Sequence, residues 1–235
     1  TAAERSQMVT PAAAPVTLTA PEVRPELYIT EETLQKSVHP GVACISCHSD
    51  AIGPLHKARL AKPTCDDAAC HAKQAGAYLH SAHAMARARG NPDAPTCFSC
   101  HGGHDIRAKS ERESPVFPLN VVKMCGSCHE KHVSRTDDGR DGAKEVANYL
   151  ESVHGKAVLK AGLTVAANGA DCHGAHDVRP SRDPLSLVNR KQVPETCGRC
   201  HVGIIGMYAG SVHGQLAAAA DVRAPGCSDC HTAHA

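Results

Sequence analysis

Hydrophobic and polar residues form no alternating pattern typical of β-strands, whereas three segments have a composition that favours helices. Each of these segments ends near Gly, Asn or Pro, which are residues that stop helices. They are Tyr78–Arg89, Lys144–Lys160 and Gly203–Ala220. The 19 glycines and 15 prolines lie mostly between motifs, as expected of loops. The pattern predicts a few short α-helices, extensive coil and almost no β-sheet.

Composition makes an ordinary protein core unexpected. Of the 235 residues, 42% are hydrophobic and 3% aromatic, with two Phe, four Tyr and no Trp. No stretch of 18 apolar residues occurs, so no transmembrane segment is predicted. The 25 basic and 24 acidic side chains nearly balance, which argues against a nucleic-acid partner. Because 13 Cys and 17 His far exceed ordinary usage, we expect something other than side chains to fill the interior.

The cysteines form a recurring motif in which a His follows the last Cys. Five plain Cys-x-x-Cys-His motifs occur: Cys44 to Cys47 with His48, Cys97 to Cys100 with His101, Cys125 to Cys128 with His129, Cys197 to Cys200 with His201, and Cys227 to Cys230 with His231. A sixth motif is longer, with four residues between Cys65 and Cys70-His71. The thirteenth cysteine, Cys172, precedes His173, and Gly169 stands where a first Cys would be.

This motif is the attachment signature of c-type haem. Two thiols add to the two vinyl groups of the porphyrin, and the adjacent His binds the iron from one face. A longer loop can span the same vinyl groups, and a lone Cys can still form one thioether. A disulfide framework or a zinc ribbon also uses paired cysteines, but neither requires a His after every second Cys.

On these motifs, residues 37–235 resemble a multihaem c-type cytochrome of the doubled-motif type. The resemblance implies seven haem c groups. Six of them would have two thioethers, and the one at Cys172 would have a single thioether. It also implies a fold of coil and short helices wrapped around a haem stack, in which the haems replace the missing apolar core.

Three segments of the chain repeat one another. Each starts at a Tyr that precedes a Ser-x-His motif, and each continues to a haem motif with a further His three residues after the first. The three tyrosines are Tyr78, Tyr149 and Tyr208. We therefore expect an extended Pro- and Ala-rich segment over residues 1–30 and a cytochrome domain over 31–235. The domain divides into unit 1 (31–77), unit 2 (78–148), unit 3 (149–207) and unit 4 (208–235).

The histidines separate into proximal and distal candidates for the iron ligands. The seven proximal ligands that the motifs predict are His48, His71, His101, His129, His173, His201 and His231. The repeat selects seven distal ligands, namely His39, His83, His154 and His213 in Ser-x-His, and His104, His176 and His234 in Cys-His-x-x-His. Three histidines stay in reserve as replacements: His56, His80 and His132. None of the four Met recurs with the repeat, so Met ligation is not expected.

Ligation by two histidines suits electron transfer. Both axial positions of each iron are filled, and the absence of Met ligation points to the low potentials that suit anaerobic respiration. The leading hypothesis is therefore electron transfer through seven closely packed low-spin haems, with the protein fixing their spacing and potentials. The partners would be redox proteins or extracellular acceptors.

Two forms of this carrier are considered. Haem c is attached outside the cytoplasm, so the chain is expected to be exported and its numbering to start after a leader has been removed. The chain resembles subunits of extracellular conductive cytochrome filaments, in which case it would form a homopolymer end to end and His234 would ligate a haem of the next subunit. The alternatives are a soluble periplasmic shuttle and a His234 that folds back onto its own chain.

An enzyme is the third hypothesis. Multihaem reductases for nitrite, hydroxylamine or tetrathionate need an open axial site, which the nitrite reductase family marks with Cys-x-x-Cys-Lys. No such motif occurs here, so we expect an electron carrier with no catalytic residues. If one haem were catalytic, the irregular attachment at Cys172-His173 would make it the candidate.

Overall fold

The computed structural model describes residues 29–52, 60–65, 70–130, 141–232 and 234. Residues 1–28, which form nearly all of the segment expected to be extended, lie outside the described residues. The same holds for the reserve histidines His56 and His132 and for the four residues between Cys65 and Cys70.

Short helices joined by turns and coil make up the described part of the chain. Its helices are α1 (Glu31–Gln35), α2 (Cys44–Cys47), α3 (Ala72–Leu79), α4 (Ala82–Ala88), α5 (Cys97–His101), α6 (Val121–His129), α7 (Gly142–Glu151), α8 (Val153–Leu159), α9 (Gly169–His173), α10 (Val193–Gly198), α11 (Val202–Gly210), α12 (Val212–Ala218) and α13 (Cys227–Cys230). The longest, α7, has 10 residues. The described residues contain no β-sheet beyond an isolated bridge position at Asp141, which confirms the expected mixture of short helices and coil.

Each of the three helices predicted from composition is two helices in the structure. The prediction of one continuous helix in each segment was therefore wrong. The breaks occur at Ser81, Ser152 and Ser211. Each Ser has extended backbone, and its Oγ accepts a hydrogen bond from the amide three residues later, at 3.0 to 3.2 Å. A Ser in this role starts a new helix, because its side chain satisfies an amide that has no partner within the helix.

Apart from the motif of Cys65 and Cys70, part of which lies outside the described residues, the cysteine motifs lie on or at the end of a helical turn, as expected. In α5, α9 and α13 the residue before the second Cys accepts a hydrogen bond from the backbone amide that precedes the helix. These acceptors are Ser99 (3.0 Å), Asp171 (2.9 Å) and Asp229 (2.7 Å). One helical turn places the first and second Cys of a motif near each other, with the His after them.

A tyrosine hydroxyl links the start of each of units 2, 3 and 4 to its first cysteine motif. The hydroxyl donates to a backbone carbonyl two residues before the first Cys position. The bonds are Tyr78 to Pro95 (2.6 Å), Tyr149 to Ala167 (2.8 Å) and Tyr208 to Pro225 (3.0 Å). The bond in unit 3 places Gly169 where units 2 and 4 have the first Cys of the motif.

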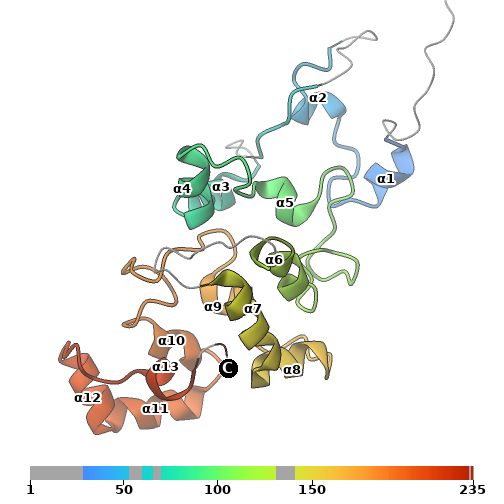
Figure 1. The fold of residues 1–235 in the computed structure, drawn as a ribbon. Helices are drawn as coiled ribbons and strands as arrows, with labels where there is room; N and C mark the ends of the chain where they lie inside the picture. The colour runs from blue at the N-terminus through green and yellow to red at the C-terminus, as the bar shows by residue number, and fades with distance from the viewer. Residues whose placement is uncertain (1–28, 53–59, 66–69, 131–140, 233, 235) are drawn as a thin grey trace, which may run out of the picture.

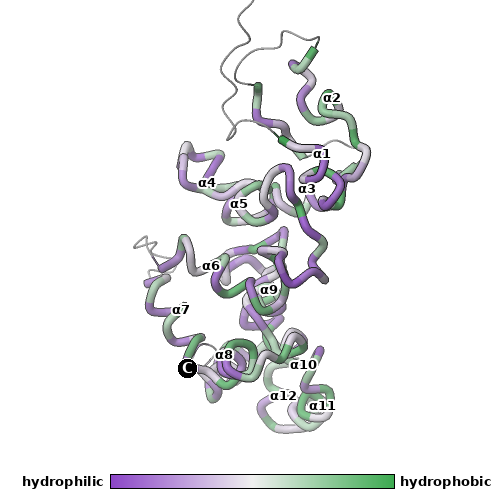
Figure 2. The backbone as a smooth tube through the Cα atoms, turned by 90° about the vertical axis from the view of Figure 1, so that its right-hand side faces the viewer, coloured by the Kyte–Doolittle hydropathy of each residue, from purple (hydrophilic) through white to green (hydrophobic). Residues whose placement is uncertain are grey.

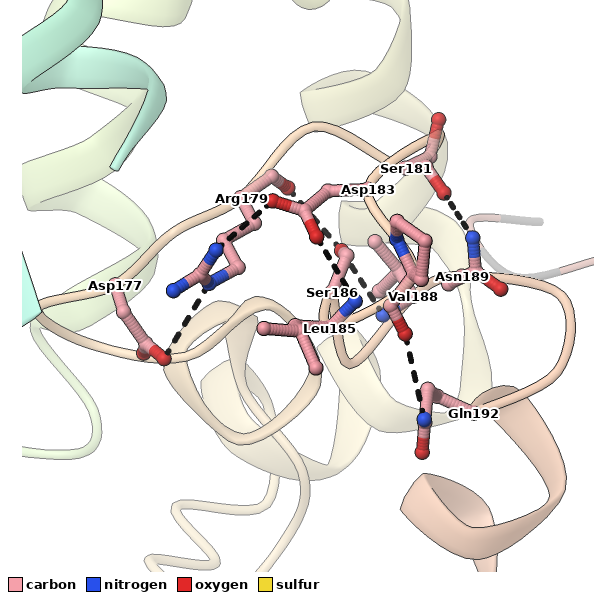
Figure 3. Close-up of polar contacts among 10 residues, drawn as sticks. Asp177, Arg179, Ser181, Asp183, Leu185, Ser186, Val188, Asn189 and Gln192 are labelled. Atoms are coloured by element: carbon pink, nitrogen blue, oxygen red, sulfur yellow. Dashed lines mark hydrogen bonds and ion pairs between the residues drawn. The ribbon is translucent and has the colours of Figure 1, made fainter. Parts of the chain in front are cut away.

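The loops that follow the first motif in units 2 and 3 are held by matching polar contacts. In unit 3, Arg179 Nη1 donates to Asp183 at 2.9 Å, and the buried Ser186 hydroxyl donates to the Arg179 carbonyl at 3.2 Å (Figure 3). Unit 2 has the same two contacts 72 positions earlier, from Arg107 to Glu111 (3.3 Å) and from Ser114 to the Arg107 carbonyl (3.3 Å). These loops therefore set the separation between the two cysteine motifs of a unit.

The units follow one another along the long direction of the molecule, from α2 at one end to α11 and α12 at the other (Figures 1 and 2). The same backbone bond joins unit 1 to unit 2 and unit 2 to unit 3. In both cases, the amide of the middle residue in Ser-x-His donates to a carbonyl of the next unit, over 2.8 Å. The two bonds are Val38 to Ile106 and Ala82 to Val178.

Few apolar side chains are buried in the described part of the chain. The buried hydrophobic residues there are Ala94, Val121, Val122, Val158 and Ala224, none larger than Val. Other apolar residues, such as Ile52, Val165 and Val222, are nearly 80% exposed or more. No helix in this part of the chain is long and apolar enough to cross a membrane.

Candidate haem sites

Among the described residues, six pairs of histidine rings lie close together. The ring centroids of each pair are 5.9 to 6.3 Å apart. The pairs are His39 with His71, His48 with His104, His83 with His129, His101 with His176, His154 with His201, and His173 with His234. Every pair joins one proximal candidate to one distal candidate, and none joins two of the same kind.

The separation of the rings fits one metal ion between them. A bond from an imidazole nitrogen to a transition metal is about 2 Å long, and the ring centroid lies about 1 Å behind the nitrogen. Two imidazoles on opposite sides of one metal therefore have centroids about 6 Å apart. Two rings in van der Waals contact would instead stack closer together, so the spacing itself points to an ion that both rings ligate.

Burial keeps several of these imidazoles neutral, which is the form that binds a metal. Burial, together with the neighbouring rings of His234 and His129, lowers the pKa of His173 to about 4. Burial likewise lowers the pKa of His83 and of His129. A neutral imidazole offers a lone pair at one nitrogen while the other nitrogen carries its proton.

Two of the ligand candidates have a partner for the second ring nitrogen. His48 Nδ1 lies 3.1 Å from the carbonyl oxygen of Ala61. His234 Nδ1 forms a hydrogen bond with the Glu145 carboxylate, and both side chains are 25% exposed. Such outer partners fix the tautomer and leave Nε2 directed at the metal.

The cysteines do not resemble a zinc site or a set of disulfides. No disulfide joins the two cysteines of any plain Cys-x-x-Cys-His motif. Burial raises the pKa of Cys125 to about 11 and also raises the pKa of Cys172. Within the described ranges no three His, Cys, Asp or Glu side chains gather as metal ligands. A haem iron needs only two protein ligands, because the porphyrin supplies four nitrogens.

The six pairs follow a register that sequence reasoning missed. A Ser-x-His histidine pairs with the second motif of its own unit, as His83 does with His129 and His154 with His201. A Cys-His-x-x-His histidine pairs with the first motif of the preceding unit, as His176 does with His101. The sequence does show that the Ser-x-His and Cys-His-x-x-His motifs follow one another in a constant order. That order alone does not say which units lie against each other.

The fold places His234 against His173, and therefore within its own chain. Of the two expectations for this residue, the fold-back is the arrangement that the structure contains. The register accounts for this pairing, because His234 of unit 4 lies against the first motif of unit 3 as His176 of unit 3 lies against the first motif of unit 2.

His213 and His231 are the two ligand candidates that the structure does not bring into a ring pair among the described residues. Both are exposed. At the corresponding positions of units 2 and 3, the Ser-x-His histidine pairs with the second motif of its own unit, and the first-motif histidine pairs with a distal histidine of the next unit. The reserve residue His80 follows α3 and lies near Asp183, whose pKa is lowered by the Leu185 amide, by Arg179 and by this histidine.

Successive candidate sites are close neighbours. Burial lowers the pKa of His101, and the nearby rings of His176 and then His71 lower it further. The nearby ring of His129 likewise contributes to the lowered pKa of His173. Cys100 adds to the burial that raises the pKa of Cys125.

The neighbour relations continue into units 3 and 4. Cys200 contributes, after burial and Asp171, to the raised pKa of Cys172. Burial raises the pKa of Cys197, and Cys227 raises it further. The sites thus form a continuous series. In chain order its proximal residues are His71, His101, His129, His173, His201 and His231.

Sequence reasoning also missed the arginines that hold the loops between motifs, Arg107 and Arg179. Their signal was readable as identical Asp-x-Arg segments in units 2 and 3, at 105–107 and 177–179. Comparison with known proteins adds nothing to this description, because no family model, curated protein or solved structure matches the chain.

Glu145 gives a prediction for the site of His173 and His234. Replacing Glu145 with Gln removes the carboxylate charge behind His234 and makes that imidazole a weaker donor to ferric iron. For a haem held between His173 and His234, we expect the potential to rise by about 50 mV, close to a tenfold change in the ferric preference. Spectroelectrochemical titration measures the shift.

Glu151→Gln is the matched control. Glu151 lies on the same helix, but its side chain is 74% exposed and pairs with Lys156, so this variant should leave the potentials unchanged. Equal potentials in both variants would contradict the role of Glu145.

Proposed function

We propose that this protein is an electron-transfer c-type cytochrome that carries seven haems along its repeat units. The observation that carries the proposal is the set of six ring pairs, each of which combines a motif histidine with a distal one at the spacing that a shared iron requires. The series of neighbouring sites from His71 to His231 supports passage of electrons along the molecule.

The residues of the chain have separate roles in this proposal. The haem iron supplies one-electron chemistry, because it cycles between ferric and ferrous states. The cysteines hold each porphyrin covalently, and the paired histidines fill both axial positions and so keep substrates away from the metal. The scarcity of buried apolar residues supports a fold in which loops wrap around a haem stack.

The same observations make a reductase less suitable. The irregular attachment at Cys172-His173 made this site the candidate for catalysis. The centroids of its two histidine rings, His173 and His234, are 6.0 Å apart. A substrate would have to displace one of them. We therefore place this protein among carriers that are exported and serve low-potential respiration.

Assembly into an extracellular filament is the second candidate function, against a diffusible periplasmic shuttle. Large apolar side chains are exposed in both terminal units, Ile45 and Ile52 in unit 1 and Val212 and Val222 in unit 4. Such surfaces favour contact between copies end to end. Negative-stain electron microscopy of unheated protein distinguishes the two: filaments with a short axial repeat support assembly, and single particles at high concentration support the shuttle.

The proposal is tested by counting the attached haems. The chain is produced with a haem-attachment system in an oxidising compartment and purified without imidazole. We expect an intact mass that exceeds the polypeptide by seven haems, and peptide mapping that finds a single thioether at Cys172. A Cys172→Ala variant should lose one haem, whereas Met207→Ala, an exposed residue outside the motifs, should keep seven. A folded protein without haem, or with zinc on its cysteines, would rule the proposal out.

A further inference from the structure

The Asp-x-Arg segments lie at the boundaries between units. In unit 3 the segment, residues 177–179, directly follows the distal candidate His176. Its middle residue, Val178, accepts the 2.8 Å hydrogen bond from the amide of Ala82 in unit 2. Ala82 directly precedes His83, so a single backbone bond connects the segments that carry two distal histidines from different units.

Both of these histidines pair with proximal candidates of the same unit. His176 lies against His101 and His83 lies against His129, and both partners belong to unit 2. The boundary between units 1 and 2 repeats this arrangement through an equivalent bond of 2.8 Å. An Asp-x-Arg segment is therefore connected to the distal candidates of both haem sites in the preceding unit. At the boundary of units 1 and 2, the two pairs concerned are His104 with His48 and His39 with His71.

Buried serines hold these segments in place. Among the described residues, the most deeply buried polar side chains are those of Ser81, Ser114 and Ser186, which are at most 1% exposed. Ser81 starts α4 at the unit boundary. The other two hydroxyls donate to the carbonyls of the two arginines, from Ser186 to Arg179 at 3.2 Å and from Ser114 to Arg107 at 3.3 Å. Because so few side chains are buried in this part of the chain, these contacts mark the segments as fixed points of the fold.

The arginine side chains anchor the same segments through carboxylates. The side chain of Arg179 is 16% exposed, and its Nη1 and Nε lie 2.9 Å from Asp183 and 4.0 Å from Asp177 (Figure 3). Arg107 is 29% exposed and pairs with Glu111 at 3.3 Å. An exposed ion pair contributes little because water replaces it, whereas removal of a largely buried guanidinium leaves its carboxylates without their cation. Loss of either arginine should therefore loosen its segment.

We propose that the arginine of each Asp-x-Arg segment positions both distal histidines of the preceding unit. Arg179 acts on His176 through the loop that the two share, and on His83 through the backbone bond at the unit boundary. Arg107 acts in the same way on the distal histidines of unit 1. The proposal rests on the haem function described above, and it assigns to unit 3 the control of ligands at the haem sites of unit 2.

The test uses the ferric seven-haem protein, purified without imidazole, and electron paramagnetic resonance to count high-spin irons. Relative to wild type, Arg179→Gln should show two additional high-spin irons, which free imidazole should return to low-spin. Arg179→Lys keeps a cation beside Asp183 and should restore most of the low-spin signal. Arg223→Gln is the matched control. The Arg223 guanidinium also pairs with a carboxylate, Asp221 at 2.8 Å, but its side chain is 87% exposed, so spin states should not change.

Combined substitutions identify the irons that respond. In His176→Ala protein one of the two irons is already high-spin, so Arg179→Gln should add only one more. In His104→Ala protein the missing ligand belongs to unit 1, and Arg179→Gln should still add two. A residue that merely supports the fold would change the spin states without this dependence on the unit.

Ser186→Ala is a second variant, which removes only the bond to the Arg179 carbonyl and should produce the same two changes in a smaller fraction of the molecules. It decides the question if Arg179→Gln does not accumulate as a folded protein. Unchanged spin states in the variants that fold would overturn the proposal, and so would a response that stays at two irons in the His176→Ala background. A failure of the proposed function is distinct from these results, because the wild-type protein would then contain no haem.

Discussion

Replacing His176 with Ala should convert one low-spin iron to high-spin without loss of its haem. His176 faces His101 across 6.0 Å with the rings only 10° from parallel, and Cys97 and Cys100 still hold the porphyrin when the distal imidazole is removed. Water is a weaker ligand for ferric iron than imidazole, so the potential of this haem should rise by about 0.1 V, within the roughly 0.8 V that axial ligands span. The reduced variant should bind one carbon monoxide, because the sixth position is then accessible.

Three measurements on the holoprotein check this prediction: electron paramagnetic resonance, carbon monoxide titration and film voltammetry. His80→Ala is the matched control, since His80 is exposed, lies close to α4 in unit 2 and belongs to none of the ring pairs. It should retain the wild-type spin state and potentials. A His176→Ala protein that is indistinguishable from wild type would remove His176 from the ligand set, and a spin change in the His80 variant would point to His80 in its place.

The candidate histidines could be selected from the sequence, whereas their pairing in the structure could not. The motif predicts His101 as a haem ligand because the reaction of two thiols with one porphyrin requires a fixed local spacing. The partner of His101 is set by how unit 3 packs against unit 2, through contacts such as the bond between Ala82 and Val178. Nothing in local spacing encodes that packing, so the sequence left His234 open to either of two arrangements.

The helices show the opposite case, in which a readable signal was overlooked. Composition from Lys144 to Lys160 favours one continuous helix, and the structure interrupts it at Ser152. Ser is among the residues that best start a helix, and a Ser stands two residues before each of His83, His154 and His213. Helix propensity sums over a window and does not register a single side chain that competes for the backbone amide.

Ser152 also explains why a glycine follows His154. The end of α7 and the start of α8 meet so closely that a Cβ on Gly155 would lie 2.0 Å from the Tyr149 carbonyl oxygen. Gly214 has the same relation to Tyr208, at 2.1 Å. Unit 2 has Ala84 at this position. There α3 ends at Leu79, one residue earlier than the ends of α7 and α11, and an extra turn residue separates the two helices.

Gly155→Ala is therefore expected to destabilise the protein strongly. The contact is with backbone, so the new methyl group can be accommodated only if α7 and α8 move apart, at a cost of about 2–3 kcal/mol, the upper range for overpacking. The same movement displaces His154 from His201, so the variant should also show one high-spin iron. Denaturant unfolding of the holoprotein measures the free energy, and resonance spectra report the ligand.

Gly206→Ala separates this clash from a general effect of the substitution. Gly206 lies inside α11, and a Cβ there meets no other atom within 4 Å. Because Ala is the better helix former, this variant should gain roughly 0.5–1 kcal/mol in the free energy of unfolding. The opposite signs of the two changes would locate the constraint at the junction of α7 and α8. An unchanged free energy of unfolding in Gly155→Ala would instead mean that α7 and α8 can move apart at little cost. The position of His154 would then have to be fixed by its haem and not by the backbone.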